Sequence, residues 1–331
     1  MALFLSRSDI QRCLVMPGAI EAMRSAFRAL HAGQVQMPQR VGVDLSTQGL
    51  ALLMPSLLQT PQRSLFGLKL LTSVADNAAR GLPRSLATIL LLDALSGQTL
   101  AIVEGGWLTA LRTRAVSGLA TDLLARPDAH VLALFGAGVQ APMQVEAIHT
   151  VRRLSEVRVV NRDDAHYEQL CQTLYARLGE SCPTIRRAET ASEALTGASL
   201  VACATAAAAP LFAARDIAPG THINAIGAFT PEMCEVDPAV LASARIVVDL
   251  RAAALSEAGD LLQAHARGFI AGADSWLELG QLVSADQPAR RSSTEITFFK
   301  SVGLGIQDLA LAYQAYERAR AMGIGVEITY S

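Results

Sequence analysis

The sequence predicts an α/β fold, in which a doubly wound parallel sheet is joined to a second, α+β domain built from both ends of the chain. Two observations lead to this prediction. From residue 131 onward, short apolar runs alternate with helical segments, which is typical of parallel sheets. Before residue 93, β-type runs instead follow one another with Pro and Gly turns between them, which is typical of antiparallel hairpins.

A third observation concerns the end of the chain. A strong helical pattern covers residues 305–322, after the alternating region has ended. A completed doubly wound sheet has no need of this helix, so we expect the tail to return to the first domain. We therefore place one domain at 1–117 together with 306–331, and the other domain at 118–305.

The first domain is expected to open with an amphipathic helix over residues 9–32. Its apolar face is formed by Ile20, Met23, Ala26, Phe27 and Leu30. The β-type runs that follow cover 41–45, 50–58, 65–74 and 85–93. A long helix is then expected from Leu108 to about Leu124, because Arg126-Pro127-Asp128 ends it.

The second domain is expected to alternate strands with helices. The expected strands are 131–135, 157–161, 184–188, 200–204, 222–226 and 245–250. The expected helices lie near 140–152, 164–179, 190–197 and 235–242. This alternation predicts parallel strands with helices on both faces.

The turn after the first of these strands has the pattern G-x-G-x-x-A at residues 136–141, which read GAGVQA. Gly136 permits a tight turn, Gly138 lets the backbone approach a pyrophosphate, and Ala141 keeps the helix close to the strand. A glycine turn alone can exist without a ligand, but here strand, turn, helix and strand follow within about 30 residues. The pattern therefore predicts a Rossmann-type dinucleotide site.

The tip of the next strand indicates which dinucleotide binds. NAD sites usually carry an Asp or Glu there, whereas this strand ends in Asn161 and is followed by Arg162. Arg162 can pair with the 2′-phosphate of NADP; its alternative role is that of a solvated surface charge. Asp163 and Asp164 come too late for the ribose and are expected to cap the next helix. We expect NADPH as the cofactor, with NADH as the alternative.

Composition and charge argue against several classes of protein. The formal net charge is −2 and there is no basic block, which disfavours a nucleic-acid partner. The apolar runs are far below membrane-spanning length, so no membrane association is expected. Five cysteines without C-x-x-C spacing and six histidines without an H-x-x-x-H pair predict neither a metal site nor disulfides. They favour a reducing cytoplasm as the location.

Cations in apolar surroundings are the first candidates for chemistry. Lys69 lies within the strand-like run FGLKLL, where it must be paired, point outward or face a ligand pocket. Arg112 occupies the first turns of an otherwise apolar helix, and arginine forms two-pronged pairs with carboxylates. Thr113 could donate to a phosphate. Arg40 is a second candidate for a carboxylate contact, or a surface residue.

The segment INAIGAFTP, residues 223–231, lies at the carboxyl end of an expected parallel strand. Ligands of open α/β sheets bind at such ends, so Phe229 and Thr230 are candidate contacts. Glu235 and Asp237 follow, and helix capping is their simplest role.

Residues 299–308 place two glycines before the last helix. Lys300, Ser301 and Asp308 are the polar residues of this segment. The simplest role of Asp308 is a favourable charge at the start of a helix.

These stretches together resemble the ornithine cyclodeaminase and mu-crystallin family. The matching segments are Lys69 with residues 76–83, then 108–113, 136–141, 223–228 with Pro231, Glu235 and Asp237, and 299–303. They span most of the chain in the family's order. The resemblance implies a homodimer and a site in which Arg40, Lys69 and Arg112 meet an amino or imino acid.

The resemblance and the motifs together give a set of expected site residues. The expected catalytic residues are Lys69, Arg112 and Arg40. The expected cofactor contacts are Thr113, Gly136, Ala137, Gly138, Val139, Gln140, Asn161, Arg162, Ala204, Thr205, Ile226, Lys300 and Ser301. The expected substrate contacts are Arg40, Lys69, Arg112, Phe229, Thr230 and Asp308.

Two departures from the family's pattern bear on the substrate. Cyclodeaminases of the family carry an Asp where this sequence has Phe229, and a phenyl ring cannot take a proton from the substrate's distal amine. Arg84 stands where many relatives have a small hydroxyl residue, and its role is open. We expect reduction of a small cyclic imino acid, Δ1-pyrroline-2-carboxylate, to L-proline, and also of the six-membered analogue, Δ1-piperideine-2-carboxylate, to L-pipecolate. The alternatives are ornithine cyclodeaminase, alanine dehydrogenase and a non-catalytic NADPH-binding protein of the crystallin type.

Overall fold

The computed structural model describes residues 1–331 apart from 47–48, 139–140, 287 and 330–331. It contains two compact units. Unit 1 comprises Met1–Ala115 together with Gly303–Ser331, and unit 2 comprises Val116–Val302. These divisions fall within three residues of the boundaries expected from the sequence. The first division lies inside helix α3 (Gly105–Leu124), which is why the sequence pattern shows no break there.

Unit 1 is a mixed sheet with helices on one face. Its strands are β1 (Ala2–Leu5), β2 (Val35–Gln36), β3 (Val41–Ser46), β4 (Gly49–Thr60), β5 (Arg63–Val74), β6 (Ser85–Asp93), β7 (Thr99–Glu104) and β16 (Val326–Ile328). Their order is β16-β1-β7-β6-β5-β4-β2, and β3 pairs with β4. All described pairs are antiparallel except the parallel pair of β1 with β7. The expected hairpin region is therefore confirmed, while β1, β2, β7 and β16 were not expected from the sequence.

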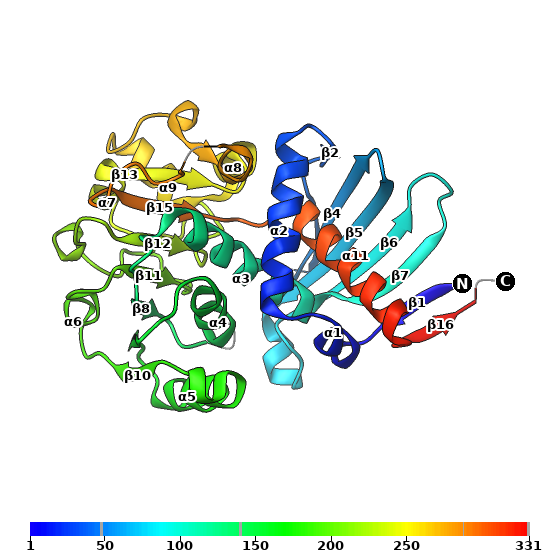
Figure 1. Ribbon diagram of the computed structural model, residues 1–331, viewed down its shortest axis with the longest axis horizontal. Coiled ribbons are helices and arrows are strands. Elements are labelled where there is room, and N and C mark those ends of the chain that lie inside the picture. The colour runs from blue at the N-terminus through cyan, green and yellow to red at the C-terminus, as the bar shows by residue number, and fades with distance from the viewer. Residues whose placement is uncertain (47–48, 139–140, 287, 330–331) are drawn as a thin grey trace. The chain divides into compact units, whose positions relative to one another are not determined.

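Helices α2 (Met16–His31) and α11 (Gly305–Met322) lie side by side against the sheet of unit 1 (Figure 1). The bounds of α11 match the expected tail helix. Gly67 of β5 permits the close approach of α11, because a Cβ at that position would lie 3.0 Å from Leu309. Since side chains alternate along a strand, Phe66, Leu68 and Leu70 point to the opposite face of the sheet.

The expectation of a single helix over residues 9–32 is wrong. The chain instead forms α1 (Arg7–Cys13) and α2, separated by Leu14 and Val15 in extended conformation. Pro17 explains the break, because it has no N–H to continue the first helix but is well tolerated in the first turn of the second.

Unit 2 is built on an all-parallel sheet. Its strands are β8 (Val131–Phe135), β9 (Glu156–Val160), β10 (Thr184–Arg187), β11 (Leu200–Cys203), β12 (His222–Ala225), β13 (Ala244–Val248), β14 (Leu277–Glu278) and β15 (Ile296–Lys300). Their order is β10-β9-β8-β11-β12-β15-β13-β14. The chain runs outward from β8 on one side and returns to β11 on the other, which confirms the doubly wound arrangement and creates a switch point between β8 and β11.

Helices and apolar clusters cover both faces of this sheet. The helices of unit 2, besides the end of α3, are α4 (Ala141–Val151), α5 (Asp164–Leu178), α6 (Ala191–Leu195), α7 (Pro238–Ser243), α8 (Arg251–Glu257), α9 (Gly259–Ala266) and α10 (Leu279–Ser284). Alternate residues of β8 enter two different cores: Phe135 packs in one and Leu134 in the other. This two-sided burial explains why the strand reads as a continuous apolar run.

Several details of unit 2 differ from the expectation, since α8, α9, α10 and β14 were not expected from the sequence. The helix expected over 235–242 begins only at Pro238, because Asp237 is its N-cap and Glu235 lies in the loop before it. Strand β15 was not expected, yet it lies between β12 and β13. Across the part of the chain that the structure describes, no helix is both long and apolar enough to cross a membrane.

Candidate active site

The glycine turn between β8 and α4 borders a pocket of about 1130 Å³ in unit 2. Gly136 has φ +97°, a conformation that favours glycine, and a Cβ there would lie 3.0 Å from the carbonyl oxygen of Ala204. A Cβ on Gly138 would meet nothing within 4 Å, so the backbone here faces open space. Helix α4 begins at Ala141, which offers N–H groups near the turn. The turn therefore has the form that a pyrophosphate requires.

The carboxyl end of β9 forms another wall of the same pocket. Asn161 Oδ1 accepts a hydrogen bond from Ala137 N at 3.4 Å, which ties the strand end to the glycine turn. Arg162 is exposed and lines the pocket. Asp163 caps α5 by accepting from His166 N at 2.9 Å, as expected. Asp163 is thus engaged as a helix cap, and Glu189 is a carboxylate that lines the same pocket.

Arg187 is a second cation in this pocket that sequence reasoning missed. It ends β10, forms an ion pair with Asp164 and donates from Nη2 to the carbonyl oxygen of Asn161 at 3.1 Å. The sequence did place Arg187 at the carboxyl end of an expected strand, which could have identified it as a pocket residue. Parallel neighbours such as β10 and β9 end at the same edge of a sheet, where ligands bind.

The expected cofactor contacts divide into three groups. Those that line the pocket are Gly136, Ala137, Gly138, Asn161, Arg162, Ala204 and Thr205. Thr113, Ile226, Lys300 and Ser301 do not line it, and Val139 and Gln140 lie outside the described residues. The Lys300 side chain has no exposed surface and forms an ion pair with Asp260 at 2.6 Å, so it supports the site from within the core.

Ser301 and Thr113 are also engaged within the protein. Ser301 Oγ donates to Asp249 Oδ2 at 2.8 Å. Thr113 Oγ1 donates to the carbonyl oxygen of Thr109, one turn earlier in α3, at 2.8 Å. Both hydroxyls keep acceptor capacity in these arrangements.

A buried charged cluster in unit 1 brings together residues from three elements. Lys69 of β5 lies 2.6 Å from Asp308 Oδ2, and Arg112 of α3 donates from Nε to Asp308 Oδ1 at 3.0 Å. Arg112 also donates from Nη1 to Gln307 Oε1 at 2.6 Å. Lys69, Arg112 and Asp308 are 2%, 6% and 1% exposed, so water screens these charges weakly. The structure thus joins two of the expected catalytic residues through Asp308.

Arg40 reaches the segment that precedes α11. Its Nη2 donates to the carbonyl oxygen of Gly303 at 2.9 Å. Gly303 has φ +87°, and a Cβ there would lie 2.6 Å from Arg112 Nη1. Glycine is therefore required at this position for both its backbone angle and the nearby guanidinium.

The electrostatics of the cluster favour an anionic ligand. Burial, opposed by Asp308 and aided by Arg112 and Arg40, lowers the pKa of Lys69 to about 8. The group is therefore largely charged at neutral pH and close to its titration point. Asp308 contacts both Lys69 and Arg112, so these two cations together exceed its single negative charge, and a substrate carboxylate can neutralise the remainder. Gln307, which orients Arg112, was missed because its role depends on a distant helix.

Phe229 and Thr230 follow β12 in unit 2. The Phe229 ring is 54% exposed, an unusual position for a large apolar side chain and one suited to contact with a ligand. Asp237 caps α7 by accepting from Ala239 N at 3.0 Å, as its simplest role predicted. Glu235 is not a cap, because its carboxylate bonds to the loops that follow β11 and β12.

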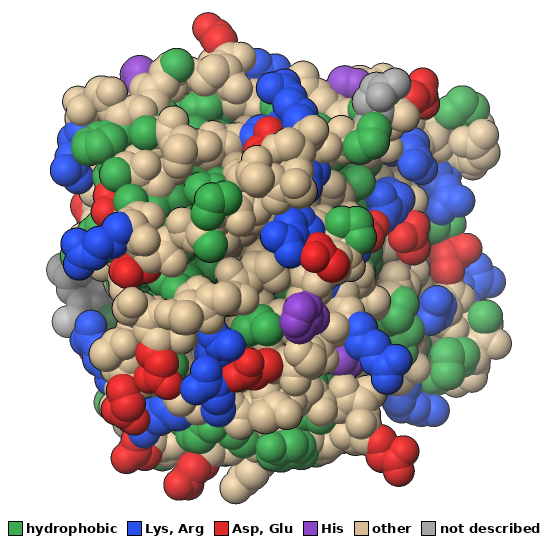
Figure 2. Space-filling view, turned by 60° about the vertical axis from the view of Figure 1, so that its left-hand side comes forward, with side chains coloured by type: hydrophobic (Ala, Val, Ile, Leu, Met, Phe, Trp, Pro, Cys, Tyr) green, Lys and Arg blue, Asp and Glu red, His purple; other side chains and the backbone are tan. Residues whose placement is uncertain are grey.

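The face drawn in Figure 2 shows Lys and Arg side chains interspersed with Asp and Glu. No single sign of charge dominates this face. The cavity with its glycine turn, at the switch point of a parallel sheet, defines the class of the fold as a Rossmann-type dinucleotide-binding protein.

The comparison with known proteins gives the family. The ornithine cyclodeaminase/mu-crystallin family model matches residues 1–323, and the chain belongs to this family. The resemblance seen in the sequence is therefore confirmed. A Delta(1)-pyrroline-2-carboxylate reductase of Bacillus cereus is 33% identical over 330 residues, which cover 99% of this chain and 100% of the relative.

Solved structures share the whole architecture. The Thermococcus litoralis Delta(1)-pyrroline-2-carboxylate reductase, in complex with NADH and L-proline, superposes with a TM-score of 0.91 at 34% identity and covers 98% of this chain and 100% of its own. An archaeal alanine dehydrogenase dimer with bound NAD has a TM-score of 0.89 at 31% identity and covers 100% and 99%.

Proposed function

We propose that this chain is an NAD(P)H-dependent imine oxidoreductase that reduces the cyclic ketimine Δ1-pyrroline-2-carboxylate to L-proline. The observation that carries the proposal is the buried cluster of Lys69, Arg112 and Asp308, whose excess positive charge suits a small carboxylate. Similarity to reductases of this imine along nearly the whole chain supports it. The six-membered analogue, Δ1-piperideine-2-carboxylate, differs by one methylene and is proposed as a second substrate, giving L-pipecolate.

Arg112 and Arg40 bind the substrate carboxylate. Arg112 is held by Asp308 and Gln307, so its guanidinium plane is fixed before the substrate arrives. Arg40 is held by the carbonyl oxygen of Gly303. Fixing the carboxylate orients the imine carbon, and orientation is the main contribution that a protein makes to hydride transfer.

Lys69 donates a proton to the imine nitrogen of the substrate. A protonated imine is the better electrophile, and an ammonium with a pKa of about 8 can donate a proton near neutral pH. When bound, NAD(P)H supplies the hydride to the imine carbon. The reaction therefore consumes one hydride and one proton. The ion pair with Asp308 favours the charged form of Lys69 before the proton is transferred.

The pocket favours NADPH over NADH. Arg162 and Arg187 both line it, and the tip of β9 offers an amide, Asn161, in place of a carboxylate. A 2′-phosphate carries charge that guanidinium groups bind through charge-assisted hydrogen bonds. NADH remains a usable cofactor in this proposal, because the glycine turn binds the pyrophosphate common to both.

The outer face of the sheet in unit 1 supports a homodimer. We define this outer face by Val41, Val43, Leu70 and Leu86, which are 54%, 47%, 43% and 46% exposed. Leu53 pairs with both Val41 and Leu70, and Thr72 pairs with Leu86, so the strands β3, β4, β5 and β6 present these residues on one face. A contiguous apolar sheet face of this kind is typical of a subunit interface.

All five cysteines are free, which favours a reducing cytoplasm.

The activity is tested with purified protein and NADPH. Addition of Δ1-pyrroline-2-carboxylate is expected to oxidise NADPH and form L-proline in equal amounts. Turnover of pyruvate with ammonia, without turnover of either cyclic imine, would establish an alanine dehydrogenase, which the similarity to the archaeal alanine dehydrogenase makes the second candidate. Release of ammonia from ornithine without added NADPH would establish a cyclodeaminase. Tight NADPH binding without any turnover would indicate a binding protein.

A further inference from the structure

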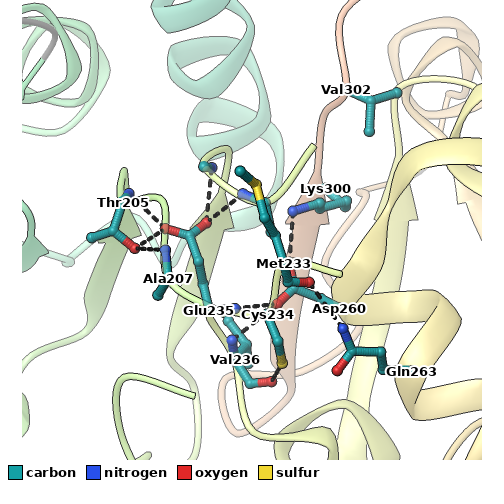
Figure 3. Close-up of polar contacts among 12 residues, drawn as sticks. Thr205, Ala207, Met233, Cys234, Glu235, Val236, Asp260, Gln263, Lys300 and Val302 are labelled. Carbon is teal, nitrogen blue, oxygen red and sulfur yellow. Dashed lines mark hydrogen bonds and ion pairs between the residues drawn. The ribbon is translucent and has the colours of Figure 1, made fainter. Parts of the chain in front are cut away.

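Glu235 occupies the centre of a polar network at the carboxyl edge of the parallel sheet, outside the substrate cluster (Figure 3). Its Oε1 accepts hydrogen bonds from Thr205 N at 2.7 Å and Thr205 Oγ1 at 2.8 Å. Its Oε2 accepts from Gly227 N at 2.8 Å and Ala228 N at 3.0 Å. The side chain is fully buried. One carboxylate therefore holds two separate loops through four hydrogen bonds.

The topology of the sheet brings these loops together. Strands β11 and β12 are parallel neighbours whose last residues, Cys203 and Ala225, pair with each other, so both loops leave the same edge. Thr205 of the first loop lines the nucleotide pocket. Gly227 must be glycine here, because a Cβ would lie 2.1 Å from the carbonyl oxygen of Thr205 and 2.4 Å from Glu235 Oε1.

A second buried carboxylate fixes the position of Glu235. Asp260 Oδ1 accepts from Glu235 N at 2.6 Å and from Val236 N at 3.0 Å. Asp260 Oδ2 forms the ion pair with Lys300, which ends β15 and pairs with Ala225 of β12. The ends of three adjacent strands are thus joined by one network, as Figure 3 shows for the residues around Lys300.

We propose that Glu235 is a positioning residue for nucleotide binding, which sets Thr205 in the pocket against the Gly227–Ala228 loop that leads to Phe229. Among the described hydrogen bonds, no other side chain bonds to both of these loops. A neutral amide in place of the carboxylate would present an N–H group toward one pair of donors, so one loop would lose its anchor. This inference rests on the proposed function only in taking the pocket as the nucleotide site.

The test compares Glu235→Gln with Glu180→Gln, which makes the same chemical change at an exposed carboxylate in a short 3-10 helix away from the pocket. The dissociation constant of NADPH is measured by fluorescence titration without any imine, together with the melting temperature. We expect Glu235→Gln to weaken NADPH binding by about 10-fold or more, in line with lost hydrogen bonds to a charged group. Glu180→Gln is expected to bind NADPH as the unaltered protein does.

Thr205→Val provides a milder variant, because it removes the hydroxyl bond to Glu235 and leaves the bond from Thr205 N. We expect a weakening of about threefold or more, and no further weakening when Thr205→Val is added to Glu235→Gln. A purely structural role would lower the melting temperature and leave the NADPH dissociation constant unchanged, which would overturn the proposal. If Glu235→Gln does not fold, Glu235→Asp, which keeps the charge on a side chain one methylene shorter, is measured in its place with the same two outcomes. Because no imine is present, the outcome stands even if the protein reduces neither cyclic ketimine.

Discussion

Lys69 Nζ lies 2.6 Å from Asp308 Oδ2, and the other oxygen of the same carboxylate accepts from Arg112 Nε at 3.0 Å. A single carboxylate is thus shared by two buried cations. Asp308 also lies in the first turn of α11, where a negative charge is favourable with the helix dipole. The simple helix-charge role expected from the sequence is therefore only part of its role, because the same side chain also raises the pKa of Lys69 against the larger lowering effect of burial.

The first prediction concerns pH. The pKa of Lys69 is lowered from an ordinary value of 10.5 to about 8, so the ammonium loses its proton as pH rises through about 8. We expect kcat/KM for the imine to fall above this pH, since the charge and the proton are both lost. Measurement of kcat/KM against pH checks this. Asp308→Asn removes the group that raises this pKa, so the fall should move to lower pH; a profile that stays flat past about pH 9 would contradict the role of Lys69.

The same shift has a consequence for stability. Between about pH 8 and 10.5 the unfolded chain binds a proton at Lys69 that the folded chain does not. The contribution of Lys69 to the free energy of unfolding therefore rises with pH across this window. Urea unfolding of the unaltered protein and of Lys69→Met, compared at the two ends of the window, isolates this contribution.

The second prediction concerns Arg112. Arg112→Lys keeps the charge but cannot contact Asp308 and Gln307 while presenting two donors to the substrate carboxylate. We expect kcat/KM to fall by about 10- to 150-fold, which corresponds to about 1.5–3 kcal/mol. NADPH affinity should be retained, because the glycine turn lies in the other unit. A variant that unfolds or loses NADPH together with the substrate would show that Arg112 is mainly structural.

The third prediction concerns the choice of cofactor. Arg162→Ala should weaken NADPH binding by about 1.5–3 kcal/mol more than NADH binding, because only NADPH carries the 2′-phosphate. Arg187→Ala provides the comparison within the same pocket, and its effect should be smaller because Arg187 is already paired with Asp164. Dissociation constants for both nucleotides check the prediction. Equal losses for NADPH and NADH would mean that Arg162 does not contact the 2′-phosphate.

The fourth prediction concerns the outer face of unit 1. Leu86→Lys places a charge on this face and should shift the protein toward monomer, as measured by light scattering after size-exclusion chromatography. Leu95→Lys is the matched control, since Leu95 is 84% exposed in the turn between β6 and β7. A dimer that survives Leu86→Lys unchanged would place the interface elsewhere.

The sequence by itself determined the features whose signals lie in contiguous residues. The strand, glycine turn and helix over 131–151 form one local unit, so their pattern predicted both the parallel sheet and the dinucleotide pocket. The tail helix was predicted with its observed bounds for the same reason. Family resemblance was also readable, because its motifs are short segments in a fixed order.

Only the tertiary structure decided how distant side chains meet. Arg112 and Asp308 are 196 residues apart in sequence, and no local pattern links them. Arg187 lines the pocket because β10 ends beside β9, and Glu235 joins two loops because β11 and β12 are neighbours. Strand order and register fix these contacts, and they follow from long-range packing of the sheet. Propensity and periodicity describe one segment at a time. They could name Lys69, Arg112 and Asp308 as candidates, but they could not show that Asp308 forms buried ion pairs with both cations.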